Sequence, residues 1–265
     1  MWYMPYLRVR RAVLVYVSIA AGITLTAVAL RFWPGGVPVV THVEGHHQYI
    51  QRSLLVAPAV TQAASLHHYV DLSMLVSAAI ALVGGLATVF GLNLAAENDG
   101  HLELAWTKPV SREGYALGIF AVDIAAMAAC VVFTAVCAAV VIDVYAGYAA
   151  VAPSDGGALL GTLAYGGLPV CVYAWIAALS ASLKRNRGAI SGIFWPLMIA
   201  LVALRAVSVP TVHAVATALN LFNPIAIFSA TGSDPHAALW SYAWGWLVAA
   251  VLLAAALVQW RRLEL

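Results

Sequence analysis

Six long apolar runs are the feature of this sequence that most limits how the chain can fold. They cover residues 12–33, 69–94, 116–143, 159–183, 188–207 and 239–260. Each run is long enough to cross the hydrocarbon core of a bilayer, which takes about 20 residues. Charged residues make up only 9% of the chain, against about 25% in soluble domains. We therefore expect an integral membrane protein with no separate soluble domain.

The composition of these runs predicts helices. Backbone groups in hydrocarbon must bond within the protein, and the runs lack the alternating polar residues of a membrane β-barrel. We expect an all-α fold with six transmembrane helices in a single domain over residues 1–265. Six spans put both termini on one side of the membrane. If that side is the cytoplasm, only Arg31, Arg52 and Arg205 of the 13 lysines and arginines lie outside, as the positive-inside rule requires.

Two segments beside the apolar runs have patterns of their own. Residues 1–11 place three arginines after several aromatic residues, which is typical of an interfacial segment on the cytoplasmic leaflet and equally of a plain basic flank. In residues 208–238, Asn223-Pro224 breaks a short helix predicted from Thr211 to Phe222. A helix too short to span, just before the last run, predicts a re-entrant or interfacial segment.

Several functions leave signatures that this sequence lacks. No GxxxxGK[ST], HExxH or GxSxG motif occurs, so we expect neither an ATP-hydrolysing site nor another enzyme active site in this chain. The formal net charge of +2 gives no reason to expect a nucleic-acid partner. Cys130, Cys137 and Cys171 lie inside apolar runs without CxxC spacing, which is typical of buried small side chains and not of disulfides or metal ligands.

The segment 95–115, between the second and third runs, is the most informative polar part of the chain. It is rich in charged residues, and Leu102, Leu104 and Trp106 add apolar side chains where water would otherwise cover the backbone. This mixture favours a docking surface for another protein. A capped helical turn that docks nowhere has the same composition, so that alternative stays open on the residues alone.

Three strings in the sequence resemble parts of one protein family. The string ENDGHLEL at 97–104, followed by KPVSR at 108–112, resembles the cytoplasmic segment between the second and third helices of type-2 ABC transporter permeases. LKRNRGA at 183–189 is similar to the basic turn between the fourth and fifth helices of that family, and LFNPIAIF at 221–228 is similar to its Asn-Pro segment before the last helix. The sequence departs from the family pattern at two positions. His101 stands where Thr is usual, and Ile119 stands where a Lys often follows the Tyr-x-x-Gly pattern.

The resemblance implies a permease subunit of an ATP-driven ABC exporter in the cell membrane. Such a subunit pairs with a second permease, identical or homologous, and with two separate ATP-binding subunits. ATP and Mg²⁺ would bind to those partners, and no cofactor to this chain. The substrate would be an amphipathic or hydrophobic compound, such as a drug, antibiotic, lipid or peptide, moved by alternating access. The alternatives are a permease linked to metal or metallo-centre maturation and a membrane scaffold subunit without a pathway.

The resemblance also assigns the contacts with the ATP-binding subunit. Four residues would belong to a coupling helix that sits in a groove of that subunit, and four would set the start of the third span. The first four are Glu97, Gly100, Leu102 and Glu103, and the second four are Pro109, Val110, Ser111 and Arg112.

A few polar and aromatic residues inside the runs are candidates for a substrate pathway. Asp123 lies roughly 12 Å along the third span from Tyr115, a depth at which an ionisable residue is a functional candidate. It has two other interpretations, a position at the headgroup level or a pair with Lys184 or Arg185. Four aromatic residues could line an apolar pathway, although aromatic residues in spans more often serve packing or an interfacial belt. They are Tyr173, Trp175, Phe194 and Trp195.

Five of the eight histidines lie in the outer loop at 34–68. They are His42, His46, His47, His67 and His68. Clustered imidazoles bind Zn or Cu or respond to pH. The two groups are far apart in sequence and no cysteine joins them, so tetrahedral geometry is not indicated. We therefore predict no metal site. If the chain does bind a metal, these five histidines are its candidate ligands.

Overall fold

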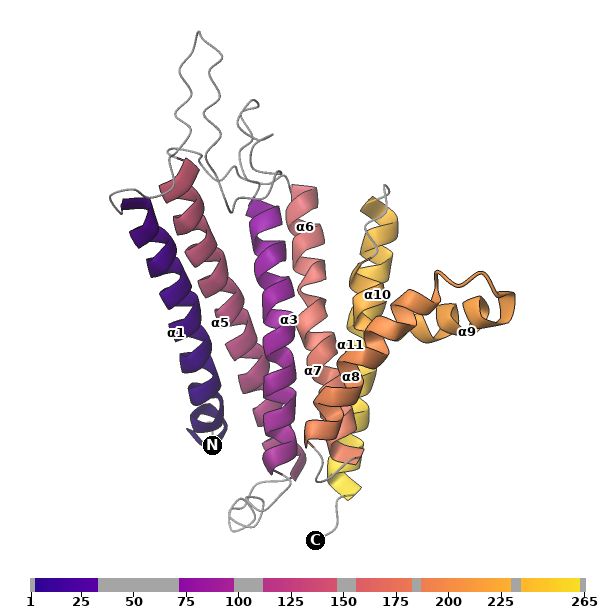
Figure 1. Cartoon of the computed structure of the whole chain (residues 1–265). Coiled ribbons are helices and arrows are strands. Elements are labelled where there is room, and N and C mark those ends of the chain that lie inside the picture. The colour runs from indigo at the N-terminus through magenta and orange to yellow at the C-terminus, as the bar shows by residue number, and fades with distance from the viewer. Residues whose placement is uncertain are drawn as a thin grey trace.

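The structure is a computed structural model and is all-helical over the residues it describes (Figure 1). These residues are 3–32, 72–97, 112–146, 156–182, 187–229 and 235–262. The helices are α1 (Tyr3–Phe32), α3 (Leu72–Glu97), α5 (Arg112–Ala146), α6 (Gly156–Tyr165), α7 (Gly167–Ser182), α8 (Arg187–Leu204), α9 (Pro210–Asn220), α10 (Pro224–Phe228) and α11 (Pro235–Arg262).

Within the described residues, five helical segments are long and apolar enough to cross a membrane. They are Val9–Leu30, Leu72–Leu92, Glu113–Val144, Leu160–Ser180 and Leu239–Gln259. The prediction of an all-helical, multi-pass membrane protein is therefore confirmed at this level. A shorter apolar helix, Gly188–Leu204, occupies most of the fifth predicted run, so a sixth crossing stays a prediction. Residues Tyr3 to Arg11 form the first turns of α1 and are continuous with its span.

The fourth predicted run is not one uninterrupted helix, because it turns at Gly166 between α6 and α7. The Gly166 amide donates to the carbonyls of Thr162 and Leu163, both at 3.1 Å. Pro169 has no amide hydrogen, so the carbonyl of Tyr165 loses the bond that a continuous helix would make to it. The two glycines at 166–167 and Pro169 together account for the break.

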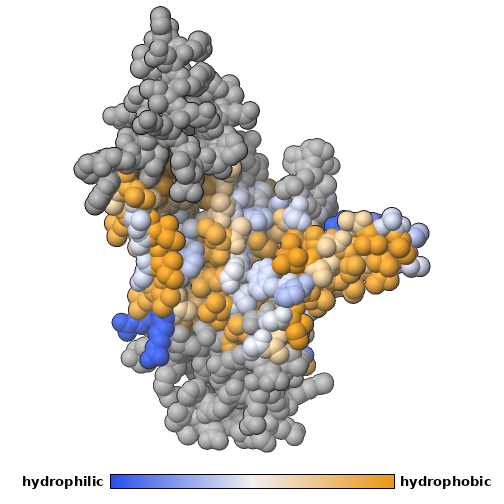
Figure 2. All heavy atoms as spheres, in the orientation of Figure 1, coloured by the Kyte–Doolittle hydropathy of each residue, from blue (hydrophilic) through white to orange (hydrophobic). Residues whose placement is uncertain are grey.

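The long helices run side by side, and α7 lies at the centre of their packing (Figure 1). It packs on α3 and on α11, whereas α1 packs mainly on α5 at the edge of the bundle. Cys171, Val172 and Ile176 of α7 are fully buried. The outward faces carry exposed apolar side chains such as Met74 and Leu82, and Figure 2 shows apolar residues across the visible helix surfaces. A bilayer would cover such faces.

Polar side chains between the helices bond to one another. Thr134 of α5 donates its hydroxyl to the carbonyl of Cys130 at 2.8 Å. The hydroxyl of Tyr16 in α1 lies 2.7 Å from the Thr134 Oγ1 atom. Because the Thr134 hydrogen is already used, Tyr16 is the donor in this contact. The bond connects α1 to α5 without exposing a polar group to hydrocarbon.

Gly91 lets α3 pack closely on α7. A β-carbon at this position would overlap the side chain of Ile176, whereas one at Gly85 of the same helix would meet nothing within 4 Å. We predict that Gly91→Ala lowers the free energy of unfolding by about 1–3 kcal/mol through overpacking. Gly85→Ala should leave stability unchanged or raise it by up to about 1 kcal/mol. Thermal unfolding of the two purified variants in detergent measures the difference, and equal melting temperatures would contradict this packing.

Candidate functional site

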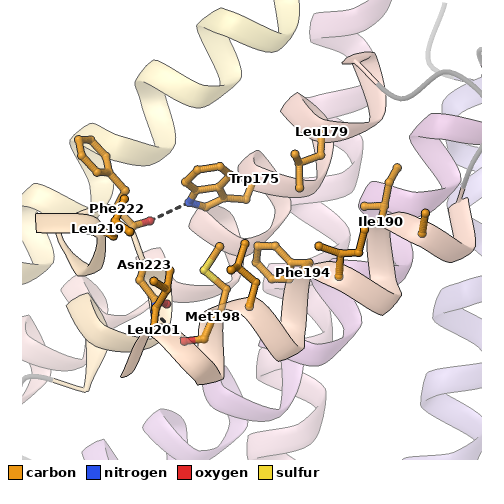
Figure 3. Close-up of a pocket in the computed structure, with 12 residues that line it drawn as sticks. Trp175, Leu179, Ile190, Phe194, Met198, Leu201, Leu219, Phe222 and Asn223 are labelled. Atoms are coloured by element: carbon orange, nitrogen blue, oxygen red, sulfur yellow. Dashed lines mark hydrogen bonds between the residues drawn. The ribbon is translucent and has the colours of Figure 1, made fainter. Parts of the chain in front are cut away.

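A cavity of about 310 Å³ lies between α7, α8 and the C-terminal end of α9 (Figure 3). We call it the α8 groove. One face of α8 supplies most of its wall, at the spacing of successive helix turns, and the rest comes from α7 and from residues 219–223. The lining residues are Trp175, Leu179, Ala189, Ile190, Ile193, Phe194, Leu197, Met198, Leu201, Leu219, Phe222 and Asn223.

The α8 groove has a buried floor and an exposed apolar rim. Ile190 and Phe194 are each 1% exposed and form part of the floor, together with Met198 and Asn223. At the rim, Ile193 is 59% exposed and Leu197 48%, and Leu219 and Phe222 are similarly exposed. The groove therefore opens at the surface of the molecule between apolar side chains.

Asn223 is the one lining residue with a polar side chain, and its hydrogen bonds are internal. Its Nδ2 donates to the carbonyl of Met198 at 2.8 Å and to Oδ1 of Asn220 at 2.9 Å. Its Oδ1 accepts from the amide of Ile225 at 3.0 Å, which caps α10 directly before Pro224. Both amide hydrogens are used, so Asn223 offers no free donor to the groove.

Asn220 makes a second set of hydrogen bonds where the end of α8 meets α9 and α10. We call this place the junction. Its Nδ2 donates to the carbonyl of Leu201 at 2.6 Å and to that of Ala216 at 2.8 Å. Leu201 lies near the end of α8. In a continuing α-helix its carbonyl would accept from the amide of Arg205, but that amide bonds to the carbonyl of Val202. The two asparagines thus connect the end of α8 to α9 and α10. The helix predicted to run to Phe222 ends at Asn220, because the chain turns here to form these contacts.

Two tryptophans bind the backbone where α9 ends. The indole nitrogen of Trp175, on α7, donates to the carbonyl of Phe222 at 2.8 Å. That of Trp244, on α11, donates to the carbonyl of Leu221 at 2.6 Å. Carbonyls at a helix end lack intrahelical partners, so these indoles satisfy them and hold the junction against the bundle. This leaves the Trp175 nitrogen committed to the backbone and its ring facing the groove (Figure 3).

A separate polar contact lies in the core between α5 and α7. The Tyr173 hydroxyl donates to Oδ2 of Asp123 at 2.6 Å, and both residues are fully buried. The Phe120 ring meets the Tyr173 ring edge to face, with centroids 6.0 Å apart. Asp123 therefore lies inside the helix packing with a phenol partner that the sequence did not indicate. Lys184 and Arg185, the other partners considered for it, lie outside the described residues.

The pathway candidates fall into three places. Trp175 and Phe194 line the α8 groove, while Asp123 and Tyr173 bond to each other in the core. Trp195 packs edge to face on Phe194, with ring centroids 5.5 Å apart, and donates to Thr88 Oγ1 of α3 at 3.1 Å. Sequence reasoning did not find the groove residues Met198 and Leu219. Their signal was the apolar helical spacing through the fifth run and the Asn-Pro break beside it.

Two of the remaining predicted site residues end helices, and the others lie outside the part of the chain that the structure describes. Gly100, Leu102, Glu103, Pro109, Val110 and Ser111 lie outside the described residues, as do His42, His46, His47, His67 and His68. Glu97 is the last residue of α3 and Arg112 the first of α5. Within the part of the chain that the structure describes, no group of three or more His, Cys, Asp or Glu residues could hold a metal ion. The three cysteines are free thiols.

No model of a known protein family matches this sequence, and no curated protein sequence matches it.

Proposed function

We propose that this chain is the membrane-spanning permease subunit of an ATP-driven ABC exporter that moves an amphipathic or hydrophobic compound across the cell membrane. The observation that carries the proposal is where the family-like residues fall. α3 ends at Glu97 and α5 begins at Arg112, at the end of the bundle where α1 begins and α11 ends (Figure 1). The Asn-Pro string likewise falls immediately before the last long helix.

In this proposal the energy comes from partner subunits. Two separate ATP-binding subunits hold ATP and Mg²⁺, and a second permease, identical or homologous, completes the pathway. Closure of the ATP-binding pair moves segment 97–112, which transmits a rigid-body shift to α3 and α5. A full reversal of an inward bias, from 1:99 to 99:1, requires a difference in ATP binding of about 5.5 kcal/mol.

Segment 97–112, the proposed contact with the ATP-binding subunit, provides the test of this function. The purified chain alone should hydrolyse no ATP, and activity should appear only with the partner ATP-binding subunit. Glu103→Arg should weaken assembly roughly 5- to 150-fold if Glu103 is a central contact worth about 1–3 kcal/mol, with loss of substrate-stimulated ATPase activity. The unfolding temperature should stay near that of the wild type, because the change lies outside the spans.

Asp143→Arg is the matched control, because it makes the same change of charge sign at the far end of α5, where Asp143 is exposed. It should leave assembly and ATPase activity unaltered. If Glu103→Arg behaves like this control, segment 97–112 is only a connector. ATP hydrolysis by the lone chain would also overturn the proposal.

The proposed topology has six spans with both termini in the cytoplasm. α8 then forms the fifth crossing, and α9 and α10 form a re-entrant or interfacial segment before α11. With the native cysteines removed, single cysteines at Ser53 and Ser154 should react with an impermeant maleimide in intact cells, and one at Ser111 should not. Labelling at Ser111 with protection at the other two positions would invert the orientation.

A further inference from the structure

We infer that the α8 groove holds the hydrocarbon chain of a membrane phospholipid, drawn from the leaflet on the side where α1 begins and α11 ends. The inference concerns the lone chain in its membrane and is independent of the exporter function. Three properties of the groove carry it: the chemistry of its wall, its length and width, and its position in the bundle.

The wall of the groove selects hydrocarbon. The indole N–H of Trp175 and both amide hydrogens of Asn223 are already donated to protein acceptors. The other ten lining residues are apolar. A polar or charged ligand would lose its hydrogen bonds to water here and regain none, which costs free energy. A hydrocarbon chain loses nothing and gains contact with the buried floor formed by Ile190, Phe194 and Met198.

The dimensions of the groove match one chain. From Ala189 to Leu201 the lining face of α8 rises about 18 Å, close to the roughly 15 Å depth of one leaflet's hydrocarbon. The volume of 310 Å³ spread over that length gives a mean cross-section of about 17 Å². Carbon atoms in contact at about 3.5–4.0 Å give a chain one carbon wide a cross-section of about 10–13 Å², so the groove has room for one chain but not for two side by side.

The position of α8 sets which leaflet supplies the chain. α8 starts near the end of the bundle that holds both chain ends and inclines outward from there, and α9 lies across the direction of the other helices (Figure 1). The groove therefore runs from near one membrane surface toward the middle of the bilayer.

A photoreactive lipid tests the inference. The purified wild-type chain is placed in phosphatidylcholine nanodiscs with a trace of phosphatidylcholine that carries a diazirine in the middle of one chain, and crosslinked residues are mapped by mass spectrometry after irradiation. Ile193 and Ile199 of α8 are both 59% exposed, but only Ile193 lines the groove. A resident chain should label Ile193 and Leu197 at least about fivefold more than Ile199, because contacts on the groove wall persist while contacts on an open face exchange.

Two substitutions add a second criterion. Ile193→Trp fills the rim and should lower labelling of Leu197 and Phe222 at least about fivefold, since the larger ring takes the space of the chain. Ile199→Trp, an equal increase in size outside the groove, should leave it unchanged. Both positions are exposed, so unfolding temperatures should stay near wild type. Leu219→Trp fills the groove from the α9 side and should repeat the effect if Ile193→Trp fails to fold.

Equal labelling of Ile193 and Ile199 would overturn the inference, because the groove would then hold only exchanging surface lipid. Labelling of Ile193 below that of Ile199 would also overturn it, since another protein surface would then cover the groove. Unchanged labelling in the groove-filling variants would do the same. No ATP-binding subunit is present in the experiment, so its outcome is separate from the test of the exporter function.

Discussion

Replacing Asn223 with alanine should lower the free energy of unfolding of the membrane domain by about 2–4 kcal/mol. The change removes both donated bonds and the cap on α10 at a position only 1% exposed. It deprives the Ile225 amide and the Asn220 Oδ1 of their bonds to Asn223, and an unsatisfied buried polar group costs about 1–3 kcal/mol. Loss of an N-cap adds about 0.5–2 kcal/mol, in part for the same bond.

The measurement is thermal unfolding of the purified chain in detergent. Thr217→Ala is the control, because Thr217 is an exposed polar residue of the same helix region, and its loss should change stability by less than about 0.5 kcal/mol. Asn220→Ala should destabilise similarly to Asn223→Ala, and the double variant should cost less than the two added together, because the residues share a bond. Additive effects would contradict the shared bond between the two asparagines. An unfolding temperature of Asn223→Ala equal to that of Thr217→Ala would show that Asn223 contributes no stability.

The second large effect concerns Tyr173. Tyr173→Phe removes a buried hydroxyl that donates to Asp123 at 2.6 Å. The change leaves a buried oxygen of Asp123 without this donor, which costs about 1–3 kcal/mol, and we expect a loss of this size. Tyr165→Phe is the matched control: among the described residues the Tyr165 hydroxyl has no hydrogen-bond partner, and this change should be nearly neutral. Equal unfolding temperatures for the two variants would contradict a structural role for the Tyr173 hydroxyl.

Asp123→Asn separates a structural role of Asp123 from a role in transport. Asparagine keeps an oxygen that accepts from Tyr173, so the variant should remain closer to wild type in stability than Tyr173→Phe. If Asp123 belongs to a substrate or ion pathway, coupled ATPase activity with the partner subunits should fall even though the fold is intact. Unchanged activity together with unchanged stability would leave Asp123 no role in the pathway.

Local chemistry explains why much of the fold was predictable. The apolar runs predict spans because the ability of a segment to cross the bilayer depends on its own length and composition. Neighbouring elements do not alter these properties. The end of α9 before Asn223-Pro224 was predictable to within two residues, since proline lacks the amide hydrogen that a continuing helix needs. The break at Gly166 had the same kind of signal, in the glycine pair and Pro169, but was missed because hydropathy alone averages over it.

The sites depend on which helix faces meet, and that is a property of the whole bundle. Asp123 and Tyr173 are 50 residues apart in the chain, and the groove unites α7, α8 and the end of α9. In water, an apolar stripe marks the face that a helix buries. These spans are apolar on all sides, because lipid and protein interior favour the same side chains. The sequence by itself therefore determined the all-helical membrane class and the break before the last span, and only the tertiary structure decided the partner of Asp123 and the residues that surround the groove.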